Sequence, residues 1–167
     1  MHNYLIEEVK QMSKEDFIEK IGHVFEDSPW VAEKTYGFVE LKGIDQLKEL
    51  FTSTVFQASE QEQLLLLRAH PDLGAKLEMT EHSVKEQQSV GLNVLSKEEY
   101  ESFFALNQRY RQRFGFPFII AVKEHTKESI KEQMQKRVEH SYDKEKEKAL
   151  KEVCKIAGYR LDQMIKA

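Results

Sequence analysis

One histidine in this sequence, His70, has the surroundings that proton-transfer chemistry requires. It follows the apolar stretch LLLLRA (residues 64–69) and precedes Pro71, which places it in the last turn of a predicted helix and fixes the exit of the backbone. The carbonyl end of a helix favours a charged imidazole, so we expect the pKa of His70 to lie near or above about 7. Such a residue can both accept and donate a proton. A histidine that only caps a structural turn fits the spacing equally well.

A cluster of polar side chains follows at residues 83–87 (SVKEQ). Ser83 and Glu86 have the spacing of a capping box, which predicts a helix that begins here. A helix N-terminus also presents backbone amides to an anion, so Ser83, Glu86 and Gln87 could face a small polar ligand. The residues by themselves leave both interpretations open.

The stretch Phe116–Val122 (FPFIIAV) is the one segment whose pattern is extended rather than helical. Because no second strand run is available to pair with it, we predict an irregular buried segment. Apolar residues in this setting usually form core. Buried backbone N–H and C=O groups nevertheless need partners, and lining the pocket of a polar ligand is one way to supply them.

Arg160 is a lone cation among the helically spaced apolar residues Ile156, Leu161 and Met164 near the end of the chain. One interpretation is a surface arginine whose stem packs on the apolar face while its head stays in water. The other is a clamp for a carboxylate or a urea-type oxygen.

The composition predicts that helices carry these residues. The 167 residues include only 7 Gly and 3 Pro, about half the average share of these two residues, which excludes collagen-like chains and turn-rich all-β folds. The 25 basic and 29 acidic residues nearly cancel and 10% of residues are aromatic, which excludes a disordered chain. The length fits one domain, residues 1–167, with a substantial core.

The same residues limit the partners and the compartment. A net charge of −4 excludes a nucleic-acid binder that relies on a global basic field. The N-terminus lacks the layout of a signal peptide, and no apolar run approaches membrane-spanning length. A single cysteine, Cys154, cannot form an intramolecular disulfide, and the six histidines lack metal-ligand spacing. We therefore expect a cytoplasmic protein without a metal site.

Helix starts are marked by Ser-x-x-acid boxes at Ser13/Asp16, Ser59/Glu62, Ser83/Glu86 and Ser96/Glu99. With the apolar periodicity they predict helices near residues 3–11, 14–25, 29–36, 45–57, 60–69, 84–91, 97–113, 127–141 and 144–165. The charged stretch Asp143–Ala149 is predicted to be a solvated helix face. The fold expected is an all-α, single-domain bundle of about eight to nine helices with an irregular buried segment near residues 116–122.

Taken together and in order, six segments of the chain resemble the 2-oxo-4-hydroxy-4-carboxy-5-ureidoimidazoline (OHCU) decarboxylase family of urate degradation. They are Phe25–Lys34 (FEDSPWVAEK), Leu67–Gly74 (LRAHPDLG), Ser83–Leu92 (SVKEQQSVGL), Leu95–Glu99 (LSKEE), Leu106–Val122 (LNQRYRQRFGFPFIIAV) and Leu150–Leu161 (LKEVCKIAGYRL). The motif HPDLG alone would be weak, whereas six segments across nearly the whole chain are specific.

The resemblance implies a helical bundle that converts OHCU to (S)-allantoin and CO₂ without a cofactor, often as a homodimer. It implies that His70 is the catalytic histidine and Glu86 its acidic partner. The substrate contacts that it implies are Pro71, Ser83, Val84, Lys85, Glu86, Gln87, Phe118, Ile119, Ile120, Ala121, Val122 and Arg160. His140 stands where family members often carry Asn, outside this site.

The family context also bears on location and partners. The chain ends in MIKA, without the peroxisomal tripeptide that eukaryotic relatives often carry, so a bacterial cytoplasmic enzyme is expected. In some bacteria this domain is fused ahead of urate oxidase. We therefore expect the chain either to be a fragment of such a fusion or to act with urate oxidase and hydroxyisourate hydrolase. Two alternatives stay open: a helical protein-interaction module without chemistry, in which His70, Glu86 and Arg160 would not converge, and hydrolysis of a neighbouring ureide.

Overall fold

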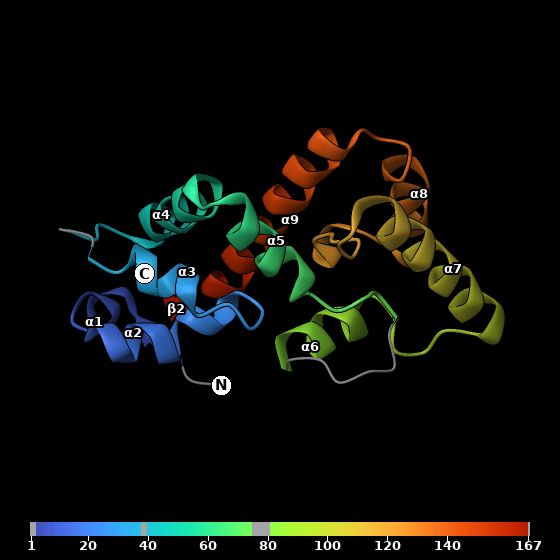
Figure 1. Ribbon diagram of the computed structural model, residues 1–167. Helices are drawn as coiled ribbons and strands as arrows, with labels where there is room; N and C mark the ends of the chain where they lie inside the picture. The colour runs from blue at the N-terminus through green and yellow to red at the C-terminus, as the bar shows by residue number, and fades with distance from the viewer. Residues whose placement is uncertain (1–2, 38–39, 75–80, 167) are drawn as a thin grey trace. The chain divides into compact units, whose positions relative to one another are not determined.

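The computed structural model describes residues 3–37, 40–74 and 81–166, and most of their regular structure is helical (Figure 1). The α-helices are α1 (Ile6–Lys10), α2 (Lys14–Lys20), α3 (Trp30–Thr35), α4 (Ile44–Gln57), α5 (Glu60–Arg68), α6 (Glu81–Ser89), α7 (Lys97–Phe114), α8 (Lys127–Arg137) and α9 (Tyr142–Met164). Two 3₁₀ turns, η1 (Gly22–Val24) and η2 (Val122–Glu124), lie between them. The prediction of an all-α fold is confirmed.

A pair of two-residue strands is the element that the sequence pattern missed. Strand β1 (Tyr4–Leu5) pairs in parallel with β2 (Ile165–Lys166). The helices predicted at residues 3–11 and 144–165 are therefore shorter than expected at these ends. Strand pairing between the two ends of a chain is a non-local contact, and local periodicity carries no information about it.

The capping boxes explain where several helices begin. The Ser96 hydroxyl accepts from the Glu99 N–H at 3.1 Å, and the Glu99 carboxylate accepts from the Ser96 N–H at 2.9 Å. This backbone hydrogen bond, helped by Lys127, lowers the pKa of Glu99. The same reciprocal pair joins Ser59 and Glu62. Each box satisfies two amides that the first turn of a helix cannot pair.

Of the two remaining predicted boxes, Ser13 acts as an N-cap, whereas the box predicted at Ser83 is wrong. Ser13 caps α2 by accepting from the Asp16 N–H at 3.2 Å. Helix α6 begins at Glu81, so Ser83 lies inside its first turn and is not the N-cap. A Ser-x-x-Glu pattern has the same i, i+3 spacing at a cap and within a helix, so the pattern alone cannot distinguish the two.

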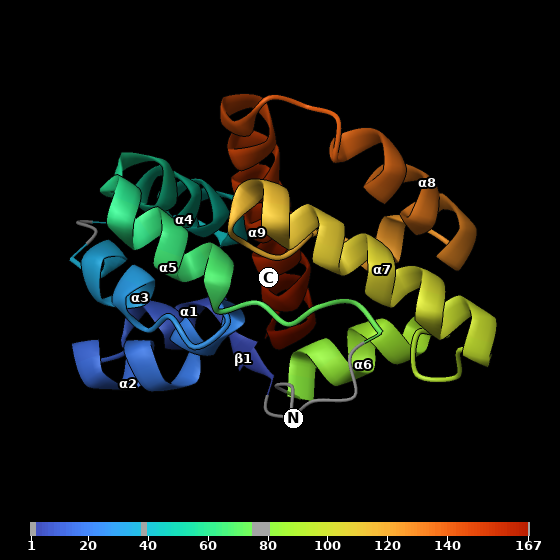
Figure 2. The same cartoon turned by 45° about the vertical axis from the view of Figure 1, so that its right-hand side comes forward.

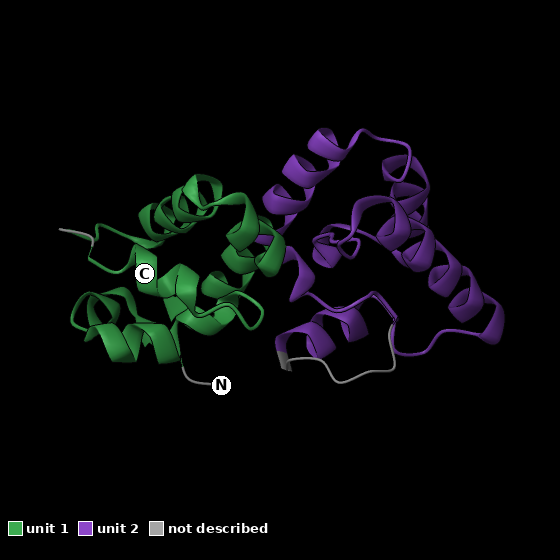
Figure 3. Ribbon diagram, in the orientation of Figure 1, with its two compact units in different colours: residues 1–66, 154–167 green, residues 67–153 purple. Residues whose placement is uncertain are grey.

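The chain divides into two compact units (Figure 3). Unit 1 consists of residues 1–66 and 154–167. Its core includes Phe51, whose ring centre lies 5.9 Å from that of Phe17 and 5.2 Å from that of Phe25. Helices α3 and α4 pack against each other in this unit. Unit 1 therefore has a core of its own.

Unit 2 consists of residues 67–153 and is built around Tyr110 of α7. The ring of Tyr110 lies 4.7 Å from Phe114, 5.9 Å from Phe116 and 5.3 Å from Phe118. Helices α7 and α8 are neighbours in this unit (Figure 2). Through these aromatic contacts Phe116 and Phe118, which follow α7, are part of the core of unit 2.

The segment from Phe116 to Val122 is irregular and buried, as predicted. Every one of its residues is buried, and no helix or strand forms until η2 begins at Val122. It starts after Gly115, which adopts a left-handed φ of 81° at the end of α7, a conformation that glycine adopts without strain.

Within the described residues, no helix is long and apolar enough to cross a membrane.

Candidate functional site

His70 lies in a turn directly after α5. The helix ends at Arg68, one residue earlier than the predicted end at residue 69, and the His70 N–H donates to the Leu67 carbonyl at 3.3 Å, which continues the turn. The side chain of His70 is buried, with 6% of its surface exposed. Pro71 follows, half-buried. A histidine at this place is shielded from bulk water but stays next to the carbonyl end of a helix.

The side-chain amides of Asn107 and Gln87 form hydrogen bonds to the backbone of the loop that follows His70. The Asn107 side chain donates from Nδ2 to the Leu73 carbonyl at 2.9 Å. The Gly74 N–H donates to Oε1 of Gln87 at 2.9 Å. Gly74 has a φ of 71°, a left-handed conformation that favours glycine. The loop is therefore fixed to both α6 and α7.

Helix α6 presents one buried polar face. Ser83 and Gln87 are one helical turn apart and are each 5% exposed. Val84 and Glu86 are half-buried, and Lys85 is exposed. Since Gly74 supplies a donor, the Gln87 atom that faces it is an oxygen, and Nε2 is the donor end of this amide.

The buried segment carries peptide groups that no described residue engages. Ile120 is 4% exposed, and neither its N–H nor its C=O bonds to another residue that the structure describes. The same holds, among the described residues, for the peptide groups of Phe118. Buried backbone polar groups are nearly always paired. Peptide groups of this kind are suited to bind a small polar ligand.

Two contacts place these elements around one part of unit 2. Gln87 joins α6 to the loop after His70, and α6 packs against η2, where the buried segment ends. The predicted site residues of the His70 loop, of α6 and of residues 118–122 therefore belong to one unit. Their roles as catalytic or binding residues stay predictions.

Arg160 lies in unit 1 and is not a surface residue. Both it and Glu26 are 1% exposed, and its Nη2 lies 2.8 Å from the Glu26 carboxylate. Its Nη1 donates to the Val24 carbonyl at 3.0 Å. Whether it reaches the same ligand as His70 stays a prediction.

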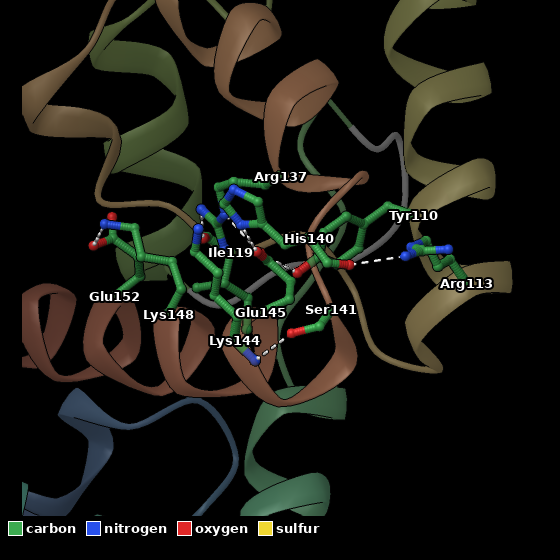
Figure 4. A network of polar contacts seen from close by, with 10 residues as sticks. All are labelled: Tyr110, Arg113, Ile119, Arg137, His140, Ser141, Lys144, Glu145, Lys148 and Glu152. Atoms are coloured by element: carbon green, nitrogen blue, oxygen red, sulfur yellow. Dashed lines mark hydrogen bonds and ion pairs between the residues drawn. The ribbon is translucent and has the colours of Figure 1, made fainter.

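The charged stretch Asp143–Ala149 contradicts its prediction as a wholly solvated face. Glu145 within it is 0% exposed. Its carboxylate accepts from Tyr110 and from Nε of Arg137, each at 2.6 Å, and lies 3.1 Å from Nδ1 of His140 (Figure 4). Glu145 is buried because a cation and a phenol from other helices satisfy its oxygens.

Two further buried charges bind the segment itself and were missed in the sequence. Nη1 of Arg137 donates to the Ile119 carbonyl at 2.8 Å (Figure 4). Glu152 accepts from the Ala121 N–H at 3.0 Å. The spacing could have indicated the burial of Glu152. Glu145 and Glu152 are seven residues apart and lie on the face of α9 that also buries Ala149.

Comparisons with known proteins converge on one family. A family model described as OHCU decarboxylase matches residues 10–162. A 2-oxo-4-hydroxy-4-carboxy-5-ureidoimidazoline decarboxylase of Halalkalicoccus jeotgali is 46% identical over 164 residues, which are 98% of this chain and 93% of that protein. The uric acid degradation bifunctional protein PucL of Bacillus subtilis is 38% identical over 97% of this chain, which spans 33% of that longer protein.

Two solved structures have a fold similar to that of this chain. The crystal structure of an (S)-allantoin synthase superposes with a TM-score of 0.79 at 30% identity, over 96% of this chain and 54% of that one. A structure of OHCU decarboxylase in the presence of (S)-allantoin has a TM-score of 0.71 over 91% of this chain and 97% of that one. Its identity of 22% makes it a likeness of fold alone.

Proposed function

Because the chain belongs to the OHCU decarboxylase family, we propose that it converts OHCU to (S)-allantoin and CO₂ in urate degradation. It is a carboxy-lyase. The observation that carries the proposal is the buried segment 118–122, in which no described residue engages the peptide groups of Phe118 and Ile120, and whose end at η2 packs against α6. A ring bearing amide and ureido groups needs donors and acceptors of this kind.

The substrate supplies its own electron sink. One ring carbon bears the carboxylate and a hydroxyl, and the neighbouring carbon is doubly bonded to nitrogen and carries the ureido group. When CO₂ leaves, the pair from the broken C–C bond forms a C=C bond, and the C=N pair moves to the nitrogen, which takes a proton. The hydroxyl then loses its proton as the ureido-bearing carbon gains one. For this reason we propose no cofactor.

In this scheme His70 transfers the proton to the carbon. A buried histidine beside a helix carbonyl end can deliver a proton from one side, which sets the chirality of the product. Glu86, half-buried on α6, orients the hydroxyl or tunes His70. The two residues come from elements that Gln87 joins, which supports their acting together.

Binding falls to the remaining residues of the predicted site. Ser83, Gln87 and Arg160 hold ureido and ring oxygens, and backbone groups of residues 118–122 bind the amide edges of the ring. Pro71, Val84 and Lys85 complete the contacts. Burial of Ser83, Gln87 and Arg160 supports this assignment, because hydrogen bonds to buried donors are not in competition with bulk water.

The test is direct. Freshly prepared OHCU is added to the protein, and its ultraviolet absorbance and the circular dichroism of the product are followed. We expect accelerated decay with formation of (S)-allantoin and CO₂. Decay no faster than in buffer would favour a non-catalytic interaction module, and turnover of a related ureide with water, without CO₂, would favour a hydrolase.

We further propose that the protein is a cytoplasmic homodimer that acts with urate oxidase and hydroxyisourate hydrolase. The bifunctional uric acid degradation protein of Bacillus subtilis supports the link to the urate pathway. Light scattering of the purified chain would give twice the 19.7 kDa of one chain. A monomer at assay concentrations would overturn the dimer without affecting the proposed reaction.

A further inference from the structure

We propose that Arg137 and Glu152 are positioning residues that hold the backbone around Ile120 in the orientation that binds substrate. The inference rests on the proposed function, in which this backbone contacts OHCU. Neither residue belongs to the site that the family resemblance implies.

Arg137 fixes one side of Ile120. Its Nη1 donates to the Ile119 carbonyl at 2.8 Å, while its Nε donates to Glu145 at 2.6 Å (Figure 4). The guanidinium carbon also lies 4.2 Å from the centre of the Phe118 ring. Because the guanidinium is a planar fork, two bonds and a stacked ring define the place of the Ile119 carbonyl relative to α9.

Glu152 fixes the other side. Its Oε1 accepts from the Ala121 N–H at 3.0 Å, and Nζ of Lys148 lies 3.4 Å from its Oε2. The side chain of Glu152 is 1% exposed. With the residues before and after it held, the Ile120 backbone has little freedom to turn. Its own N–H and C=O, which no described residue engages, are then available to a ligand.

Stability alone does not account for these charges. A buried ion pair is weak grounds for stability, since apolar residues of similar volume often stabilise a fold as much or more. Among the described residues, Nη2 of Arg137 also has no hydrogen-bond partner, which is unfavourable for a buried donor. What an apolar residue could not supply is the donor for Ile119 and the acceptor for Ala121.

The experiment compares two substitutions of the same length. Glu152→Gln keeps an oxygen that can accept from Ala121, and Glu152→Met removes it. We expect Glu152→Gln to keep the KM for OHCU within about twofold and Glu152→Met to raise it roughly 5- to 100-fold, the effect of losing one buried hydrogen bond. The matched control is Glu147→Met, because Glu147 lies on the same helix with 61% of its side chain exposed.

A purely structural role predicts a different outcome. Glu152→Met would then melt at a lower temperature but keep the wild-type KM in its folded fraction, and that result would overturn the proposal. If Glu152→Met does not fold, amide exchange in the wild-type chain decides. The Ala121 amide should exchange slowly with and without (S)-allantoin, and the Ile120 amide resonance should shift on adding it. Fast exchange at Ala121 contradicts the proposal even if wild-type protein is inactive on OHCU, so the two proposals fail separately.

Discussion

The side-chain oxygen of Gln87 accepts a hydrogen bond from the backbone N–H of Gly74 at 2.9 Å. This bond ties helix α6 to the loop that starts at His70. It also fixes which end of the Gln87 amide faces the loop, because a backbone N–H can only donate. The other end, Nε2, is therefore the donor that we assign to an oxygen of the substrate.

Changing Gln87 to Glu tests that assignment. The carboxylate would still accept from Gly74 but would turn the second atom from a donor into a negatively charged acceptor. We expect a rise in KM for OHCU of about tenfold or more with little loss of fold, because a hydrogen bond to substrate becomes a repulsion. Gln88→Glu is the control, since Gln88 is the exposed neighbour and the change in charge is the same. Equal kinetics for the two variants would refute the role of Nε2.

Replacing His70 with Asn tests the proton-transfer step. Asn is polar and of similar size but cannot carry a proton at neutral pH. We expect the rate to fall roughly 10²- to 10⁴-fold and the remaining product to lose its excess of (S)-allantoin, because protonation then occurs from solvent. Steady-state kinetics and circular dichroism of allantoin measure both effects. A near-normal rate with normal chirality would remove His70 from the mechanism.

Arg160 can be tested apart from its ion pair with Glu26. Arg160→Met leaves the Glu26 carboxylate buried without this cation and should lower the unfolding free energy by about 3–5 kcal/mol. The double variant Glu26→Met/Arg160→Met removes both charges and should recover most of that stability. Urea unfolding measures the stability of each variant.

The activity of the double variant then separates the two roles of Arg160. If Arg160 binds substrate, activity on OHCU stays low although stability returns. Recovery of both stability and activity would show that Arg160 serves the fold of unit 1 alone.

Tyr110 makes the stability of the protein sensitive to alkaline pH. Burial, with help from the hydrogen bond to Glu145, raises the pKa of Tyr110 well above its ordinary value of 10.0. Above about pH 10 the unfolded chain releases this proton while the folded chain keeps it, so the unfolding free energy falls by up to about 1.4 kcal/mol per pH unit. Below pH 10 the contribution is fully present.

Tyr110→Phe isolates this effect. At pH 8 the variant should be less stable than wild type by about 1–3 kcal/mol, because Glu145 loses a buried donor. The difference should narrow between pH 10 and pH 11, since only the wild type loses stability through this phenol. Denaturant unfolding at each pH measures the difference in unfolding free energy between the two proteins. A constant difference across this range would contradict the assignment.

Local contacts explain how much of the fold could be predicted. The boxes at Ser13, Ser59 and Ser96 join residues three apart, so the sequence alone contains both partners. The irregular segment Phe116–Val122 could also be predicted from local sequence. Glycines and prolines are few in this chain, and Gly115 and Pro117 both lie at the start of this segment. The box at Ser83 failed because the same spacing occurs inside a helix.

Burial of charge could not be predicted in the same way. Glu145 belongs to a run of alternating charges that a solvated helix would also carry. It is buried because Tyr110 lies 35 residues away and Arg137 lies eight residues away in sequence, yet both reach its carboxylate. A charge enters the core only when such partners meet it there.

The sequence by itself thus determined the class of fold, most helix starts, and the place where the helices are interrupted, since each depends on residues close together in the chain. Only the tertiary structure decided that Arg137 and Glu152 form hydrogen bonds to the backbone on either side of Ile120. The same is true of the hydrogen bond from the loop after His70 to Gln87. Those contacts join residues from different helices and loops. Their energy depends on burial and on hydrogen-bond geometry, which exist only after the chain has folded.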